Sequence, residues 1–215
     1  MFALDPSLGR DEPLRVLALG AHADDVEIGA GGTVFRLIAE RPQTEVTLVV
    51  FSASGARIDE ARASADALLA DAARADVHVL GFRDGYFPVE AAEVKGWAQA
   101  HLEGLRPHLV LTHRRDDAHQ DHRVVADLAW QTFRGAAIAA YEIPKWDGDL
   151  DRPNAYVALD AATLDRKVAH LGAHFASQQA KGWYDGETFR GLARIRGVEA
   201  GARYAEAFHC AKLVW

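Results

Sequence analysis

Residues 14–33 read LRVLALGAHADDVEIGAGGT and carry the strongest indication of how this chain folds. An apolar run, LRVLALG, comes first, and a histidine and three acids follow it within AHADDVE. Nearly every position of the run is apolar, as expected of a strand that is buried on both faces of a sheet. Carboxylates this close repel one another, so we expect a bound cation or a reaction to require them.

The rest of the chain repeats the alternation of short apolar runs with longer amphipathic ones. Strands are predicted at residues 14–20, 45–51, 77–81 and 109–113, with later candidates at 136–143 and 155–159. Helices are predicted at residues 31–40, 59–74, 90–105 and 123–134, and residues 159–180 also have a helical pattern. The final stretch, from residue 204 onward, is ambiguous. This order predicts an α/β fold, a Rossmann-like three-layer sandwich with a mostly parallel central sheet.

The composition limits the class of protein. The 215 residues, 49% of them apolar, suffice for a real core, and without repeats or linkers we expect residues 1–215 to form a single domain. A net charge of −7 argues against a nucleic-acid partner. The lone Cys210 excludes a disulfide within the chain, and we see neither a signal peptide nor a membrane span. We therefore expect a cytoplasmic protein, and a homo-oligomer stays open.

Histidine and aspartate gather again in THRRDDAHQDHR, residues 112–123, directly after the fourth predicted strand. This second cluster contains His113, Asp116, Asp117, His119, Asp121 and His122. Ligands of open parallel sheets bind beyond the carboxyl ends of the strands, where the strand order reverses. With the strand order 3-2-1-4-5, strands one and four are neighbours, so the two clusters would face each other across one crevice.

The combined clusters offer imidazoles and carboxylates but no thiolate. Such ligands suit Zn²⁺, with Fe²⁺, Co²⁺ or Mn²⁺ as alternatives. His22 and Asp25 can reach one ion from a single turn, and His122 is the natural third ligand from the opposite loop. Asp24 would then lie beside the ion, free to act as a base on water.

These motifs resemble those of the PIG-L family of metal-dependent N-deacetylases, also called LmbE-like. The family pattern (A/P)HPDD(E)…GGT stands here as AHADDVEIGAGGT, and its HxDH pattern stands as HQDH, residues 119–122. Weaker similarities are RIDE (57–60), GFRDG (81–85), YE (141–142), SQ (177–178) and YAEAF (204–208). Ala23 replaces the usual proline, which would stiffen the ligand loop, but this change removes no ligating group.

The resemblance implies a zinc-dependent hydrolase that removes an acetyl or small acyl group from an N-acylated amino sugar conjugate or a related amide. His22, Asp25 and His122 would bind the metal, and Asp24 would be the general base for water attacking the amide carbonyl. A cationic His119 would stabilise the oxyanion or protonate the leaving amine, and Asp121 would orient a histidine.

Substrate contacts are predicted less directly. Arg57 can reach the crevice or pair with Glu60 on the surface, and Asp84 can bind substrate hydroxyls or simply form a turn. Glu142 and Gln178 are candidates by resemblance alone. The expected partner is a small N-acylated molecule.

Other functions remain open at this stage. A metal-dependent amidase or esterase acting on a non-sugar natural product, a metal phosphoesterase and a non-catalytic metal- or sugar-binding protein would use similar side chains. A dinucleotide site is disfavoured, since GAGGT (29–33) departs from G-x-G-x-x-G at Val34 and its loop is acidic.

Overall fold

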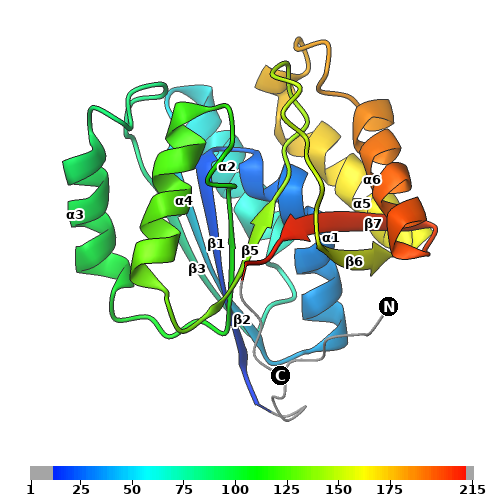
Figure 1. Cartoon of the computed structure of the whole chain (residues 1–215), viewed down its shortest axis with the longest axis horizontal. Coiled ribbons are helices and arrows are strands. Elements are labelled where there is room, and N and C mark those ends of the chain that lie inside the picture. The colour runs from blue at the N-terminus through cyan, green and yellow to red at the C-terminus, as the bar shows by residue number, and fades with distance from the viewer. Residues whose placement is uncertain (1–11, 212–215) are drawn as a thin grey trace.

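The computed structural model describes residues 12–211 and is built around a seven-stranded sheet with the order β3-β2-β1-β4-β5-β7-β6 (Figure 1). The strands are β1 (Leu14–His22), β2 (Thr44–Ser52), β3 (Arg74–Val79), β4 (Leu109–Thr112), β5 (Ala137–Tyr141), β6 (Ala155–Leu159) and β7 (Tyr204–His209). Strands β1 to β5 are parallel, and β7 pairs antiparallel with both β5 and β6. The predicted mostly parallel α/β sandwich is confirmed.

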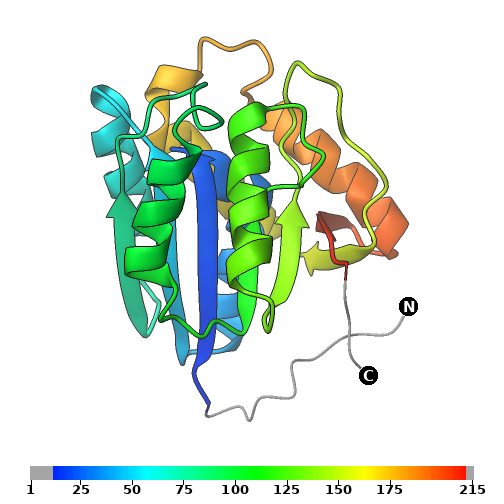
Figure 2. The same ribbon diagram turned by 60° about the vertical axis from the view of Figure 1, so that its left-hand side comes forward.

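Helices cover both faces of the sheet (Figure 2). They are α1 (Asp25–Glu40), α2 (Ala56–Leu68), α3 (Ala91–Leu102), α4 (Gln120–Thr132), α5 (Ala161–His174) and α6 (Gly186–Ala200), with a 3₁₀ turn at Ala176–Gln178. Alternate residues of β1 enter opposite cores: Val16 and Ala18 pack in the core with α1 and α2, while Leu17 and Leu19 pack with α3 and α4. This double burial explains why LRVLALG is almost entirely apolar.

Helix α1 begins six residues earlier than the glycines suggested, at Asp25 rather than residue 31. Glycine lowers helix propensity, but here close neighbours require it. A Cβ on Gly29 would lie 2.2 Å from Tyr141 Cδ2, and one on Gly32 would lie 2.6 Å from Leu159 Cδ1. The motif therefore lets α1 approach the sheet closely immediately after the acidic loop.

Helices α2 and α6 also differ from the prediction. Helix α2 ends at Leu68 although alanines continue to residue 73, because Arg74 already pairs with Glu45 of β2. Helix α6 was not predicted. It begins after Asp185, whose side chain accepts the N–H of Thr188, and it ends at Gly201 with φ 68°. Both are ordinary helix-capping arrangements.

Some sequence expectations concern residues 1–11 and 212–215, which lie outside the described part of the chain. They include most of the N-terminal segment and the last residues of the ambiguous final stretch. Among residues 12–211, none of the helices has the length and apolarity that a bilayer crossing requires.

Strands β1 and β4 bring the two acidic clusters together. Their pairing runs from Val16 and Leu109 to Ala18 and Leu111, and both strands then end at the same edge of the sheet. Beyond the pairing, the amide of Ala21 donates to His113 Nε2 at 2.9 Å instead of to a strand carbonyl. A side chain of the second cluster thus takes over the hydrogen bonding where the strands separate.

Candidate metal centre and active site

His22 and Asp25 come from the turn that joins β1 to α1. The amide of His22 donates to Asp25 Oδ2 at 2.6 Å, and His22 Nδ1 lies 3.4 Å from the same oxygen. This bond closes the turn and points both side chains toward the start of α4.

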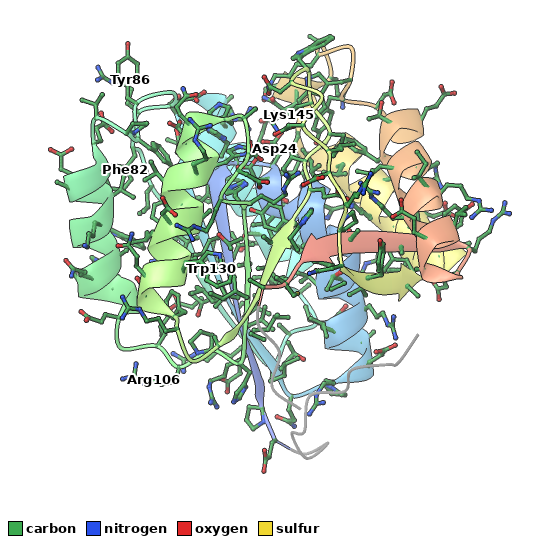
Figure 3. All side chains as sticks on the ribbon, in the orientation of Figure 1. Asp24, Phe82, Tyr86, Arg106, Trp130 and Lys145 are labelled. Carbon is green, nitrogen blue, oxygen red and sulfur yellow. The ribbon has the colours of Figure 1, made fainter. Side chains whose placement is uncertain are left out.

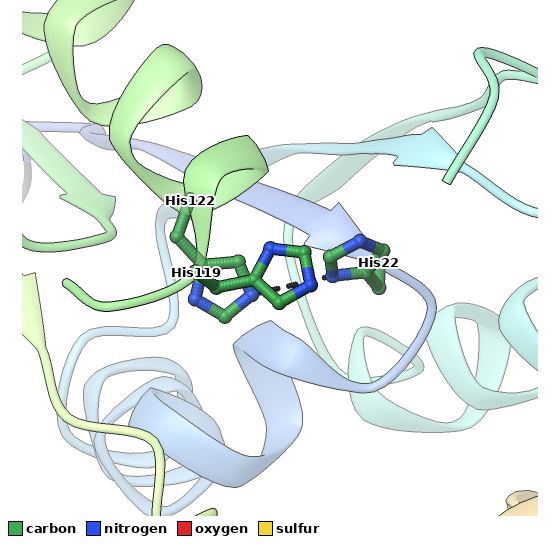
Figure 4. A group of neighbouring side chains, drawn as sticks. All are labelled: His22, His119 and His122. Carbon is green, nitrogen blue, oxygen red and sulfur yellow. Dashed lines mark hydrogen bonds between the residues drawn. The ribbon is translucent and has the colours of Figure 1, made fainter. Parts of the chain in front are cut away.

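His122 reaches the same point from the first turn of α4. Its Nε2 lies 3.2 Å from His22 Nδ1 and 3.6 Å from Asp25 Oδ1 (Figure 4). The three predicted ligands therefore converge, although about a hundred residues separate the two histidines. His119 lies close by, and His22, His119 and His122 present nitrogens within 4.8 Å of one another.

His22 and His122, the two predicted ligand histidines, each have a carboxylate near the other ring nitrogen. His22 Nε2 lies 3.3 Å from Asp121 Oδ2, and His122 Nδ1 lies 3.1 Å from Asp117 Oδ2. Asp121 is held in turn by the amides of Gly85 and Phe87, at 2.6 and 3.1 Å. Such carboxylates fix the orientation of a metal-binding imidazole and increase its basicity.

The charges of this pocket fit a divalent cation. Burial acts to lower the pKa of His22, but Asp121, Asp25 and Asp84 raise it well above its ordinary value. Burial acts to raise the pKa of Asp25, but the imidazoles of His122 and His113 lower it well below its usual range. Negative charge is therefore in excess, and a metal ion would replace the proton that the acids draw to His22.

Asp24 occupies the N-cap position of α1 but makes no side-chain capping bond. Its Oδ1 instead accepts a hydrogen bond of 2.6 Å from Arg57 Nη2. Burial raises the pKa of Asp24, and the Arg57 guanidinium opposes the shift. The carboxylate is thus a stronger proton acceptor than an exposed aspartate, and one oxygen is fixed by the arginine.

His119 is the N-cap residue of α4, and its Nδ1 accepts the amide N–H of Asp121 at 3.3 Å. Burial and the imidazoles of His122 and His22 lower the pKa of His119. This direction favours the neutral ring, whereas the sequence interpretation used a cationic one. Because Nδ1 accepts the amide N–H of Asp121, Nε2 is the nitrogen left to donate.

The predicted substrate-binding residues lie in different places. Asp84, with 74% of its side chain exposed, lies 3.1 Å from His22 Nε2, so it joins the site along with Arg57. Glu142 is buried, and both of its oxygens accept hydrogen bonds from Arg196 at 2.6 and 2.8 Å. Its carboxylate therefore faces α6 rather than the histidines.

Arg57 does not pair with Glu60 on the surface, which was the alternative to a place in the crevice. Glu60 accepts hydrogen bonds from the amide and hydroxyl of Ser177, at 2.8 and 2.6 Å, whereas Arg57 bonds Asp24. The neighbouring Gln178 is buried and donates from Nε2 to Ser177 Oγ at 2.9 Å. The SQ motif thus attaches the 3₁₀ turn to α2.

Sequence reasoning assigned no role to three residues that the structure places in or beside the centre. His113 is fully buried, lies 3.2 Å from Asp25 Oδ2 and stacks on His122 with ring centroids 3.9 Å apart. Asp117 supports His122, as described above, and Lys145 contacts Asp117 at 3.2 Å. The position of His113 directly after a strand was an available signal, whereas no local signal marked Lys145.

The chain is similar to known proteins in both sequence and fold. The sequence profile of the family described as PIG-L, GlcNAc-PI de-N-acetylase, matches residues 17–133. The structure is similar to N,N'-diacetylchitobiose deacetylase from Pyrococcus horikoshii, with a TM-score of 0.72 and 23% identity over 92% of this chain and 84% of that chain.

Two further solved structures share the architecture. Teicoplanin deacetylase Orf2, in a zinc-inhibited form, has a TM-score of 0.74 and 15% identity over 91% of this chain and 97% of that chain. GalB, the 4-carboxy-2-hydroxymuconate hydratase from Pseudomonas putida, has a TM-score of 0.68 and 19% identity over 94% of this chain and 97% of that chain. Identities this low show a common fold, and that fold serves a hydratase as well as deacetylases.

Proposed function

The chain belongs to the PIG-L family and is an N-deacetylase, a hydrolase of amide bonds, and from this premise we propose that its substrate is an N-acylated amino sugar conjugate. The group removed is acetyl or another small acyl group. We assign Zn²⁺ as the metal, with His22, Asp25 and His122 as its ligands.

The observation that carries this proposal is that the three proposed ligands converge beside two further polar side chains, Asp24 and His119, which are not needed as ligands. A structural zinc site normally uses a closed set of four protein ligands, whereas a catalytic site uses three. Here Asp24 and His119 adjoin the three ligands without belonging to them. They supply the base and the hydrogen-bond donor that hydrolysis of an amide requires.

The chain's own residues divide the work as follows. When bound, zinc supplies Lewis-acid activation of water and of the amide carbonyl. Asp24 accepts a proton from the attacking water on the oxygen that Arg57 leaves free. His119 donates from Nε2–H to the developing oxyanion, and Asp121 keeps His22 oriented and holds the His119 tautomer through its amide. As the C–N bond breaks, Asp24 gives the proton that it took from the water to the amine nitrogen, and the amine and a carboxylate are released.

The polar groups next to these residues favour a sugar as the substrate. Asp84 is exposed beside His22 and has acceptor oxygens for hydroxyl groups. Arg57 reaches the same side of the centre through Asp24, with remaining N–H donors for a sugar oxygen. Paired acceptors and donors of this kind suit the hydroxyls of an amino sugar better than an apolar acyl amide.

The test combines metal analysis with a release assay. The protein is stripped with a chelator, reloaded with Zn²⁺, and assayed for acetate release from N-acetylglucosamine conjugates, with acetylated non-sugar amines and acetate esters as comparison substrates. We expect one zinc per chain and activity on the sugar amides that disappears with the metal.

Release only from the non-sugar compounds would overturn the sugar assignment. Two ions per chain with phosphate-ester hydrolysis would instead identify a phosphoesterase. No turnover of any substrate by a chain holding one zinc would favour a non-catalytic binding protein.

A further inference from the structure

The loop at residues 142–154, which follows β5, is attached to the metal centre by a buried lysine. Lys145 has only 9% of its side chain exposed, and its ammonium lies between two carboxylates. It donates to Asp149 Oδ1 and Oδ2 at 2.6 and 2.7 Å, and it lies 3.2 Å from Asp117 Oδ1. Figure 3 labels Lys145 on this loop, together with Asp24 at the start of α1.

Asp117 contacts both Lys145 and His122, one of the proposed metal ligands. While Oδ1 faces Lys145, Oδ2 lies 3.1 Å from His122 Nδ1. The amide of His119 also donates to Asp117 Oδ1 at 2.8 Å. One carboxylate, 3% exposed, therefore holds the ligand His122, the start of α4 and the lysine of another loop.

Asp149 holds the other end of the loop. Its Oδ2 accepts the amide N–H of Ala118 at 2.8 Å, and its carbonyl accepts from Arg114 Nη1 at 2.7 Å. Between the two anchors, Trp146 is 75% exposed, and a Cβ on Gly182 would stand 3.6 Å from its ring. The loop that Lys145 fixes therefore extends from the metal centre to the segment following α5.

We propose that Lys145 is a positioning residue that sets His122 through Asp117 and, through Asp149, sets the loop against which the substrate lies. The proposal rests on the proposed zinc site. Lysine is needed because the buried carboxylate of Asp117 would otherwise face the half-buried carboxylate of Asp149 without compensation. Its removal should let Asp117 turn away from His122, and loss of such a supporting partner typically weakens metal binding by about 10–100-fold.

The experiment compares four variants of the full chain. Lys145→Met removes both contacts, and Asp149→Asn weakens the loop anchor while leaving Lys145 beside Asp117. Lys145→Arg retains the charge, and Lys95→Met makes the same chemical change at an exposed site on α3. The readouts are the Zn²⁺ dissociation constant by chelator competition, kcat and KM separately, and the melting temperature of the metal-free protein.

We expect Lys145→Met to raise the zinc Kd at least about tenfold and to lower kcat. Asp149→Asn should raise KM with zinc Kd and kcat unchanged. Lys145→Arg should recover most of the zinc affinity, and Lys95→Met should match the wild type. If Lys145→Met does not fold, Lys145→Gln takes its place with the same expectation.

A merely structural lysine would give a different pattern. The melting temperature would fall in Lys145→Met and Asp149→Asn alike while zinc Kd stayed within twofold of the wild type, and that result would overturn the proposal. The zinc measurement needs no turnover, so the two proposals can fail separately. If the deacetylase assignment is wrong, Lys145→Met should still weaken zinc binding. If this inference is wrong, zinc affinity should not depend on Lys145.

Discussion

Two buried charge clusters lie along α1, and they differ in whether their charges are satisfied. Near the middle of the helix, Lys167 donates to Glu206 Oε1 and to the carbonyl of Ile28, both at 2.6 Å. Glu206 also accepts from the amides of Gly32 and Thr33, at 2.9 and 2.6 Å. This cluster is closed, because each charge faces an opposite charge or a backbone dipole.

The cluster at the start of α1 is open. Ligand atoms of His22, His119 and His122 lie within 4.8 Å of one another, and so do those of Asp25, His113 and His122. The neighbouring acids Asp121, Asp25 and Asp84 raise the pKa of His22 against the effect of its burial. Burial is similar in the two clusters, so burial alone does not mark a site. What distinguishes a site is buried charge whose partners within the chain are insufficient, and the following experiments test that distinction.

The largest effect is expected at Asp24. Replacing it with Asn removes the proton acceptor but none of the three ligands, so kcat should fall by about 10²–10⁴-fold while the zinc content stays at that of the wild type. Metal analysis and acetate release on the same preparation check this. Asp25→Asn is the control and should lose zinc, and equal zinc loss in both variants would refute the division of roles.

The closed cluster should respond in stability rather than in metal binding. Glu206→Gln leaves Lys167 buried without an opposite charge, and breaking such a pair typically costs about 3–5 kcal/mol of unfolding free energy. Urea unfolding of the metal-free protein measures this, and zinc affinity should not change. A loss of unfolding free energy below about 1 kcal/mol, the range of surface ion pairs, would mean that Lys167 does not depend on Glu206 for its counter-charge.

A smaller effect is expected at His119, which we propose lies beside the metal without binding it. His119→Ala removes one donor to the oxyanion, and comparable losses in other hydrolases lower kcat by about 10²–10³-fold. Zinc should be retained. Should zinc fall to the content of His122→Ala, the two histidines would have to exchange roles.

The smallest effect concerns pH and involves another closed contact of α1. Ser64 Oγ donates to Glu27 Oε1 and lies 2.8 Å from His170 Nε2. Burial lowers the pKa of His170 to about 4 from an ordinary 6.5. As the pH falls, His170 therefore binds a proton in the unfolded chain before it does so in the folded chain. The contribution of neutral, buried His170 to the free energy of unfolding is complete above pH 6.5 and is lost as the pH falls toward 4.

The slope from His170 is at most about 1.4 kcal/mol per pH unit. Urea unfolding of the wild type and His170→Gln between pH 7 and pH 4 measures it, and the variant should show a shallower decline. Parallel curves would mean that His170 does not titrate with unfolding.

The sequence predicted the part of the fold whose signals are local. Strands β1, β2 and β4 contain the apolar runs that marked them, and their alternation with helices implied the order in which β1 and β4 are neighbours. Strand β3 is mixed in character and begins at Arg74, three residues before its predicted start. The insertion of β7 between β5 and β6 could not be inferred, because it depends on pairings such as Tyr141 with Phe208, far apart in the chain. Helix α6 had capping residues at both ends but few apolar positions to mark it.

The same distinction holds within the site. His22, Asp25, His119 and His122 stand in short motifs that adjacent strand ends bring together, so their meeting could be predicted. The contact between Asp117 and Lys145 depends on the path of the loop after β5, and the pairing of Glu142 with Arg196 depends on the docking of α6. The local pattern of apolar and polar residues predicts neither the course of that loop nor the docking of α6.

The hydrogen bonds of Glu206 also have a consequence for how the protein is made. The helix that carries Asp25 precedes six of the seven strands in the chain, and the carboxylate that binds its Thr33 amide lies 173 residues later. On the ribosome, α1 must wait for β7 to emerge before its middle turn gains these partners and Lys167 gains its counter-ion. The acidic turn at the start of that helix is therefore synthesised long before the middle of the helix gains these contacts, because β7 follows every other strand of the sheet in the chain.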